Sequence, residues 1–252
     1  MHIPFKKQLF CAFAAALAAG SALADTLTVA TEGTFAPFEF YDSKSGQLVG
    51  FELDLAKAMA AKLGKEAVIE PYKFDAILPA VMTGTIDFAA AGFAVTPERA
   101  QKVLFTEPFY QSGLTIIVPK GNPDGVKDYS DLEGKRVSVQ LGSISHDKAK
   151  TIKGAKITAF ESSADAILNL ISGNADAVIN AAPATDYMLV QRPALKKKVV
   201  RLDILTDGTP MAMVISKSKP ELRDSLNKAL KELKADGTYS KIHEKWFGRP
   251  AE

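Results

Sequence analysis

The chain of 252 residues contains one cysteine, Cys11, and three histidines. Cys11 lies in an N-terminal segment that we expect to be removed, so the remaining chain can form no disulfide and offers no thiolate. His146 and His243 are expected on exposed helices, and no convincing acid–base pair accompanies them. The sequence therefore predicts no metal site, no cofactor and no enzyme.

A surplus of charge of one sign is also lacking. The 31 basic residues include Lys6 and Lys7, and without these two the basic residues equal the 29 acidic ones. A nucleic-acid partner would favour a clear basic excess. The composition therefore argues against such a partner.

Only one long apolar run is present, over residues 9–19. Lys6 and Lys7 precede it, and Ala22–Leu23–Ala24 closes it in an A-x-A arrangement, which predicts a secretory signal peptide over 1–24 and a periplasmic mature protein. The run is too short to span a bilayer. Cys11 leaves a lipoprotein as the alternative, although Phe10 is bulky for that motif and the run continues past the cysteine.

Segments typical of strands and of helices alternate along the rest of the chain. We expect strands at 26–31, 68–69, 114–118, 137–139, 177–179, 199–202 and 212–215. We expect helices at 51–63, 74–82, from about 146, at 164–171, at 220–233 and at the C-terminus. This alternation predicts an α/β fold with mostly parallel sheets and helices on both faces.

Two similar segments, 84–88 and 173–178, each combine a glycine, an aspartate and a following strand. They favour two lobes of like construction. Glycine and proline interrupt the pattern near 112–113 and 206–210, where the chain would cross between lobes. We therefore expect lobe 1 to comprise 25–112 and 210–252, and lobe 2 to comprise 113–209.

The stretch AGFAVTPER at 91–99 is the strongest local signal. Gly92 lets the backbone approach a ligand closely. Thr96 and Pro97 are typical of a helix start, and Arg99 on the first turn carries donors suited to a carboxylate. The alternative is a surface helix whose arginine is solvated.

Longer motifs surround this stretch: VATEGTFAPFEF (29–40), LVGFELDLAKAMAAKLG (48–64), FDAILPAVMTGTIDFAAAG (74–92), TPERAQKVLFTEPFYQSG (96–113), LEGKRVSVQLGS (132–143), ISGNADAVIN (171–180) and GTYSKIHEKWFG (237–248). With them, the chain resembles the periplasmic solute-binding proteins of polar amino-acid ABC transporters over nearly all of 26–249. The glutamine, arginine and lysine/arginine/ornithine binders are the most similar. The resemblance implies the two-lobed type II fold, two crossing strands, hinge closure on a ligand, and a monomer recognised by a membrane permease.

The resemblance also implies a ligand pocket: Glu32, Phe35, Phe74, Ala91, Gly92, Arg99, Gln140, Ser143 and Asn180. The phenylalanines would form aromatic walls, and Glu32 would contact the far end of the ligand. The backbone at 91–92, with the Arg99 side chain, would bind the α-carboxylate, and the last three residues would add polar contacts from lobe 2. Packing in the core, a strand end and a helix cap are the structural alternatives for several of them.

Two positions depart from the family pattern. L-α-amino-acid binders usually have an acid directly after the position of Asn180, and a hydroxyl two residues after the glycine; here these are Ala181 and Ala94. A buried ammonium without an acid would be costly. Either Glu32 or Asp186 supplies the charge, or the ligand is not an ordinary L-α-amino acid.

Two other functions stay open at this point. Cyclohexadienyl dehydratases resemble these binders, so an enzyme on the same scaffold is one alternative, although Glu32 alone is a thin catalytic apparatus. The other is a binder that serves a signalling receptor, which the sequence does not separate from transport.

Overall fold

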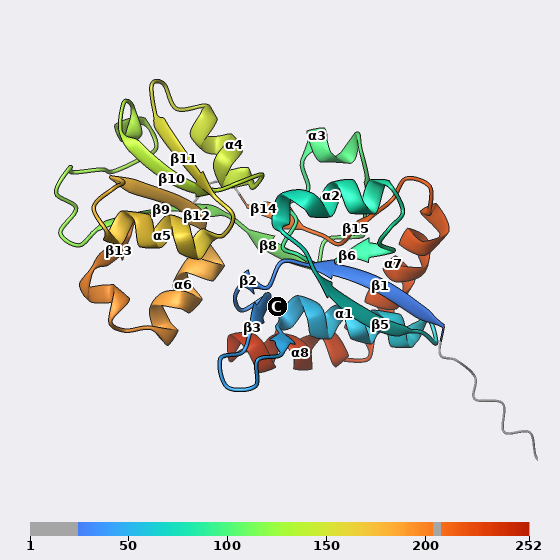
Figure 1. The fold of residues 1–252 in the computed structure, drawn as a ribbon. Helices are drawn as coiled ribbons and strands as arrows, with labels where there is room; N and C mark the ends of the chain where they lie inside the picture. Colours follow the sequence, from blue (N-terminus) through green and yellow to red (C-terminus); the bar gives the residue numbers. More distant parts are fainter. Residues whose placement is uncertain (1–24, 204–207, 252) are drawn as a thin grey trace, which may run out of the picture.

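The computed structural model describes residues 25–203 and 208–251. The predicted signal peptide, 1–24, lies outside the described residues. Two α/β halves lie side by side, and β8 and β14 run between them (Figure 1). The two-lobed α/β expectation is confirmed.

The first five-stranded sheet has the order β5-β1-β6-β15-β7. Its strands are β1 (Thr26–Thr31), β5 (Glu66–Pro71), β6 (Phe88–Ala89), β7 (Leu104–Phe105) and β15 (Val214–Ile215). β1 is parallel to β5 and β6, whereas β15 is antiparallel to both of its neighbours. Four strands therefore run one way and one strand runs against them.

The second sheet repeats this plan in the order β11-β10-β12-β9-β13. Its strands are β9 (Leu114–Pro119), β10 (Arg136–Gln140), β11 (Lys156–Phe160), β12 (Ala177–Ala181) and β13 (Val199–Arg201). Here β9 is the inverted strand. The sheets are thus mostly parallel, as expected, with one antiparallel strand in each.

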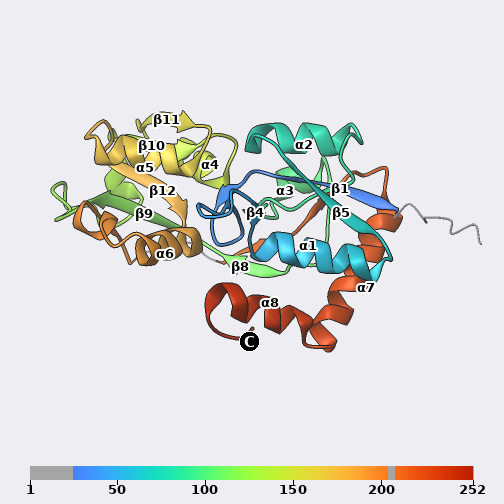
Figure 2. The same ribbon diagram turned by 60° about the horizontal axis from the view of Figure 1, so that its bottom comes forward.

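The inverted strands follow directly from the crossings. β8 (Tyr110–Ser112) pairs antiparallel with β14 (Thr209–Met211), and each then leads into the inverted strand of the other half, β9 or β15. Figure 2 shows β8 between the two halves. A single strand at 212–215 was expected. The structure instead has β14 and β15 as two short strands, because the chain changes its pairing partner between them. The division of the chain into lobes at 112 and 210 stays a prediction.

Five helices accompany the first sheet: α1 (Phe51–Lys62), α2 (Phe74–Met82), α3 (Pro97–Ala100), α7 (Pro220–Ala235) and α8 (Thr238–Phe247). Three accompany the second: α4 (Ile144–Lys150), α5 (Ser163–Ile171) and α6 (Ala182–Gln191).

α6 was not expected, although Pro183 in its first turn is a known helix-start signal. α4 begins two residues before the expected start at 146, because Ser143 caps it. A small three-stranded meander, β2 (Thr34–Phe35), β3 (Glu39–Tyr41) and β4 (Leu48–Val49), was also not expected.

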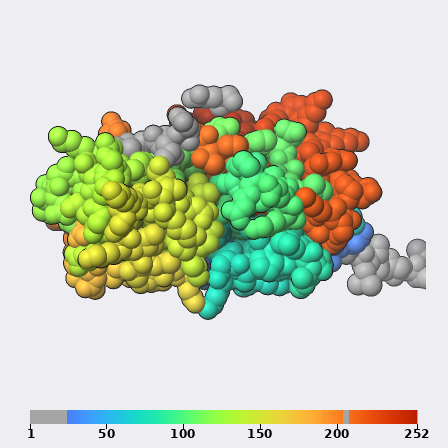
Figure 3. Space-filling model, turned by 90° about the horizontal axis from the view of Figure 1, so that it is seen from above, coloured from blue at the N-terminus to red at the C-terminus, as the bar shows by residue number. Residues whose placement is uncertain are grey.

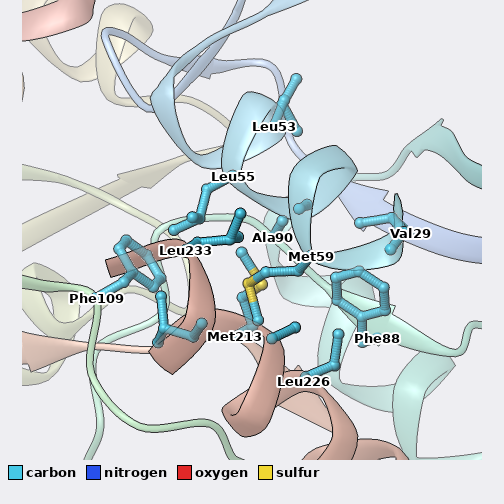
Figure 4. Packing of buried hydrophobic residues seen from close by; sticks show 14 of the residues in the cluster. Val29, Leu53, Leu55, Met59, Phe88, Ala90, Phe109, Met213, Leu226 and Leu233 are labelled. Atoms are coloured by element: carbon cyan, nitrogen blue, oxygen red, sulfur yellow. The ribbon is translucent and has the colours of Figure 1, made fainter. Parts of the chain in front are cut away.

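The larger apolar core lies between the first sheet and α1, α7 and α8. Leu55 and Met59 of α1 point toward Leu226 and Leu233 of α7, beside Phe88 of the sheet (Figure 4). These side chains are at most 2% exposed. Their burial fixes α7 against the first half, and α7 directly follows the strands β14 and β15 in the chain. His243, expected to be exposed, is buried on α8 because it packs between Tyr239 and Phe247.

No helix among residues 25–203 and 208–251 is both long and apolar enough to cross a membrane.

Candidate functional site

A cavity opens between the two halves, at the carboxyl ends of β6, β10 and β12. This edge is where α/β proteins place ligands, because helix starts and loops converge there. Its walls come from both halves and from the crossing strands: Phe35, Phe74, Ala91, Gly92, Ala94, Arg99, Ser112, Leu114, Gln140, Ser143, Ile144, Ser145, Asn180, Ala181 and Met211.

Arg99 is the charged residue of this wall and is only 7% exposed. Thr96 caps α3 by accepting a hydrogen bond from the Arg99 backbone N–H at 3.2 Å, as the sequence predicts. The guanidinium lies over the rings of Phe74 and Phe93, at 5.9 and 5.2 Å from their centroids. Burial lowers the pKa of Arg99, partly offset by Asp147 and Glu98, but an arginine stays protonated in a protein.

The Arg99 side chain connects the two halves. Nη1 donates to the Ala94 carbonyl and Nη2 donates to the Gly142 carbonyl, both at 3.0 Å. A guanidinium has five N–H donors. The remaining donors can still meet a carboxylate.

Ala94 supplies a second donor beside the guanidinium. It forms an antiparallel bridge with Met211, and the neighbouring Val95 N–H and Phe93 carbonyl bond to the chain at 210–212. In such a bridge, the N–H and C=O of Ala94 itself both point away from β14. The carbonyl meets Arg99, and among the described residues the N–H has no partner.

The Gly92 N–H, expected to bind the ligand carboxylate, instead has a partner within the protein. It donates to Glu52 Oε2 at 2.8 Å, so it points to the core rather than to the cavity. Gly92 has φ of 65°, and a Cβ there would lie 2.7 Å from Phe35 Cε1, so only glycine fits without displacing that ring. Its role in the cavity wall is to allow the close approach of Phe35.

Glu39 and Glu52 form a pair of fully buried carboxyls behind this loop. Both oxygens of Glu39 and Oε1 of Glu52 receive no hydrogen bond from a described N–H or O–H group. Burial raises the pKa of both, and the Glu52 charge raises that of Glu39 further. The raised pKa of both groups favours a proton on the pair, which would then give these oxygens a partner.

On the opposite wall, polar side chains are tied to their own half. Gln140 Nε2 donates to the Glu161 carbonyl at 3.2 Å, and Ser143 Oγ caps α4 while donating to the Gln140 carbonyl. Asn180 Nδ2 donates to Thr185 Oγ1 at 3.1 Å, which leaves Asn180 Oδ1 as an acceptor. These contacts hold the polar groups in place at the ends of β10 and β12.

The structure brings eight of the nine expected residues together around the cavity: Phe35, Phe74, Ala91, Gly92, Arg99, Gln140, Ser143 and Asn180. Glu32 is not in the wall. Its carboxylate accepts hydrogen bonds from Thr34 N at 2.9 Å and Thr34 Oγ1 at 2.6 Å, and burial raises its pKa.

Five residues of the wall were missed from sequence: Ser112, Leu114, Ile144, Ser145 and Met211. Ser112 and Leu114 flank the glycine already expected at a crossing. Ile144 and Ser145 follow a helix cap. Only their common position in the wall of the folded protein identifies them.

The two halves touch across the cavity. Besides the Arg99–Gly142 contact, Lys73 of the first half forms an ion pair with Glu161 of the second. Figure 3 shows the yellow segment of one half against the cyan segment of the other. These contacts hold the two halves together at the edge of the cavity. The described residues contain no group of three or more His, Cys, Asp or Glu side chains that could hold a metal ion.

Residues 27–249 match the family of bacterial extracellular solute-binding proteins, family 3. This chain belongs to that family. The family 3 protein described here is 30% identical over 253 residues to the ABC transporter arginine-binding protein 1 of Escherichia coli strain K12, covering 96% of this chain and 99% of the relative.

Solved structures agree with this assignment. An ancestral arginine-binding protein bound to arginine has a TM-score of 0.84 and 42% identity, covering 88% of this chain and 98% of the other. An ancestral amino acid-binding protein, AncCDT-1, a precursor of cyclohexadienyl dehydratase, has a TM-score of 0.79 and 42% identity, covering 88% and 95%. These relatives are binding proteins, which supports a binding protein rather than an enzyme.

Proposed function

We propose that this protein captures a small amino-acid-like carboxylate between its two lobes and delivers it, as a monomer, to an ABC permease in the membrane. Buried Arg99 beside the unpartnered Ala94 N–H carries the proposal. A cation and a backbone donor on one side of an enclosed wall suit a carboxylate, because charge-assisted hydrogen bonds are strong where water is excluded. The amino-acid binders among the relatives support the same class of ligand.

The test is binding by the purified chain without residues 1–24. Thermal shift against amino acids, ω-amino acids, amines and organic acids should single out carboxylates, because a ligand that binds only the native state raises its melting temperature. Calorimetry should then show an affinity loss of about 10- to 100-fold in Arg99→Ala, the usual worth of a charged hydrogen bond. Arg223→Ala is the matched control, because Arg223 on α7 pairs with Asp224 and does not line the cavity, and it should bind normally. Unchanged affinity in Arg99→Ala would contradict the proposal that Arg99 binds the carboxylate.

The placement in the periplasm and the division into lobes are part of the same proposal. The A-x-A site before Asp25 supports cleavage there, and the two sheets support lobes of 25–112 with 210–252, and of 113–209. N-terminal sequencing of the protein from a periplasmic extract should begin at Asp25. A chain that retains residues 1–24 would contradict the export step.

A further inference from the structure

The walls of the cavity hold one charge, and it is positive. Of the described residues that line it, none is an aspartate or a glutamate, and Arg99 is the cation. The rest of the wall is apolar or neutral, with Phe35, Phe74 and Met211 among its larger side chains. A cavity with this balance suits an anionic ligand that carries no cationic group.

The described acids named below all lie outside the wall of the cavity. Glu32 accepts from Thr34, Asp186 pairs with Arg201 at 3.1 Å, and Glu161 pairs with Lys73. Asp75 and Asp147 are exposed and lie outside the wall. The two acids considered from sequence as substitute partners for an ammonium, Glu32 and Asp186, therefore do not line the cavity and have partners of their own.

Glu39 and Glu52 do not supply the missing charge either. Both are fully buried and neither lines the cavity, whereas the neighbouring Phe35 and Gly92 do. Glu52 accepts the Gly92 N–H, so turning it toward a ligand would leave that backbone donor without a partner. The pair supports the loop rather than contacting the ligand.

An ammonium or a guanidinium enclosed here would lose its hydration and gain no carboxylate. That cost is several kcal/mol for a buried ion without a partner. For a carboxylate, Arg99 and the Ala94 N–H offset the lost hydration by binding it directly.

We infer that the ligand is a small monocarboxylate with an apolar body and no amino group at position 2, such as a 2-oxo or 2-hydroxy acid. This inference rests on the proposed function and narrows its ligand class. The carboxylate would lie on Arg99 and Ala94, and the apolar body between Phe35 and Phe74. A neutral oxygen at position 2 would lie within reach of the polar side chains of the opposite wall.

Matched pairs of ligands test the inference by calorimetry: 4-methyl-2-oxopentanoate against L-leucine, and phenylpyruvate against L-phenylalanine, with L-arginine as the cationic probe. We expect an oxo acid to bind at least about 10-fold more tightly than its amino acid, a difference of about 1.4 kcal/mol. Tighter binding of an amino acid, including arginine, that is lost in Arg99→Ala would overturn this inference but leave the proposed function intact. Failure of every carboxylate to bind would overturn both.

A charge placed on the wall gives an independent test. Ala181 lies at the end of β12 in the cavity wall, so Ala181→Asp adds a carboxylate there, and Ala181→Asn adds the same volume without charge. Ala181→Asp should reverse the preference toward the amino acid, whereas Ala181→Asn should keep the preference for the oxo acid. Equal behaviour of the two variants would contradict a role for the missing charge.

Discussion

At the residue scale, the loop at 91–94 depends on a carboxyl pair far from it in sequence. Glu52 accepts the Gly92 N–H, and Glu39 lies beside Glu52 with no other described partner for its oxygens. Burying two carboxyls together is tolerable only if they hold a proton, because two adjacent buried charges would repel. The loop that presents the Ala94 N–H is therefore supported by a protonated pair.

The pair should make the stability of the protein fall as pH rises. Burial raises the pKa of Glu52 above the ordinary carboxyl value of 4.5, so the native state keeps a proton that the unfolded chain loses. The stabilisation is complete below about pH 4.5 and is lost as pH rises toward the native pKa, by at most about 1.4 kcal/mol per pH unit for each proton. In Glu52→Gln, the decline between about pH 5 and about pH 8 should be shallower.

Chemical denaturation at several pH values measures this decline. Glu98→Gln is the control, because Glu98 is exposed on α3 and its pKa is lowered by Lys102, the opposite direction. The control should keep the decline of the unchanged protein. Identical pH slopes in Glu52→Gln and the unchanged protein would show that the pair holds no extra proton.

At the element scale, α7 connects the second crossing strand to the core. Its apolar face, with Leu226, Leu230 and Leu233, packs beneath α1 and the first sheet. This packing fixes where β14 and β15 enter the first half, and β14 in turn places Met211 and bridges Ala94. A helix remote from the cavity thus determines part of its wall.

Leu230→Ala should destabilise the protein by about 2 to 5 kcal/mol, since Leu230 is 1% exposed and its loss leaves a cavity. Leu168→Ala, on α5 with Leu168 57% exposed, should change stability by no more than about 0.5 kcal/mol. Urea denaturation of both variants measures the difference. Similar losses in the two variants would contradict the packing described for α7.

At the scale of the whole molecule, the cavity exists only while the halves are together. Arg99 reaches across to Gly142, and a Cβ on Gly142 would lie 3.3 Å from Asp75 Cβ. Because β8 and β14 are the strands that pair between the halves, rotation about them would separate these contacts. Ligand entry should therefore require the halves to part.

A disulfide across the cavity tests this requirement. A Cβ on Gly142 would lie 3.3 Å from Asp75 Cβ, slightly less than the about 3.5–4.5 Å of disulfides, and residues 25–252 contain no competing cysteine. Gly142 has φ of 71°, so a cysteine there costs about 1 to 3 kcal/mol of backbone strain, which lowers stability without preventing the cross-link. In Asp75→Cys/Gly142→Cys, oxidation in the presence of ligand should slow ligand release by at least about 10-fold. Reduction should restore the normal rate, which stopped-flow exchange measures. Fast exchange in the oxidised variant would show that the halves need not separate.

The sequence by itself determined the kind of fold and most of the elements. Helix caps such as Thr96, glycine stops and apolar periodicity act over a few residues, so they can be read locally. The family motifs placed eight residues of the cavity wall, Arg99 among them. Short strands such as β14 and those of the β2–β4 meander were not predicted from sequence, because pairing with other strands, rather than local preference, defines them.

Only the tertiary structure decided which donors and charges face the ligand. Whether the Gly92 N–H is free depends on Glu52, and whether Glu32 reaches the cavity depends on how Thr34 holds it. Which side of Ala94 and of Ala181 faces the cavity depends on their pairing with β14 and β9. Hydrogen bonds and packing between residues far apart in the chain decide which charges line the cavity. Local sequence patterns cannot predict these long-range contacts.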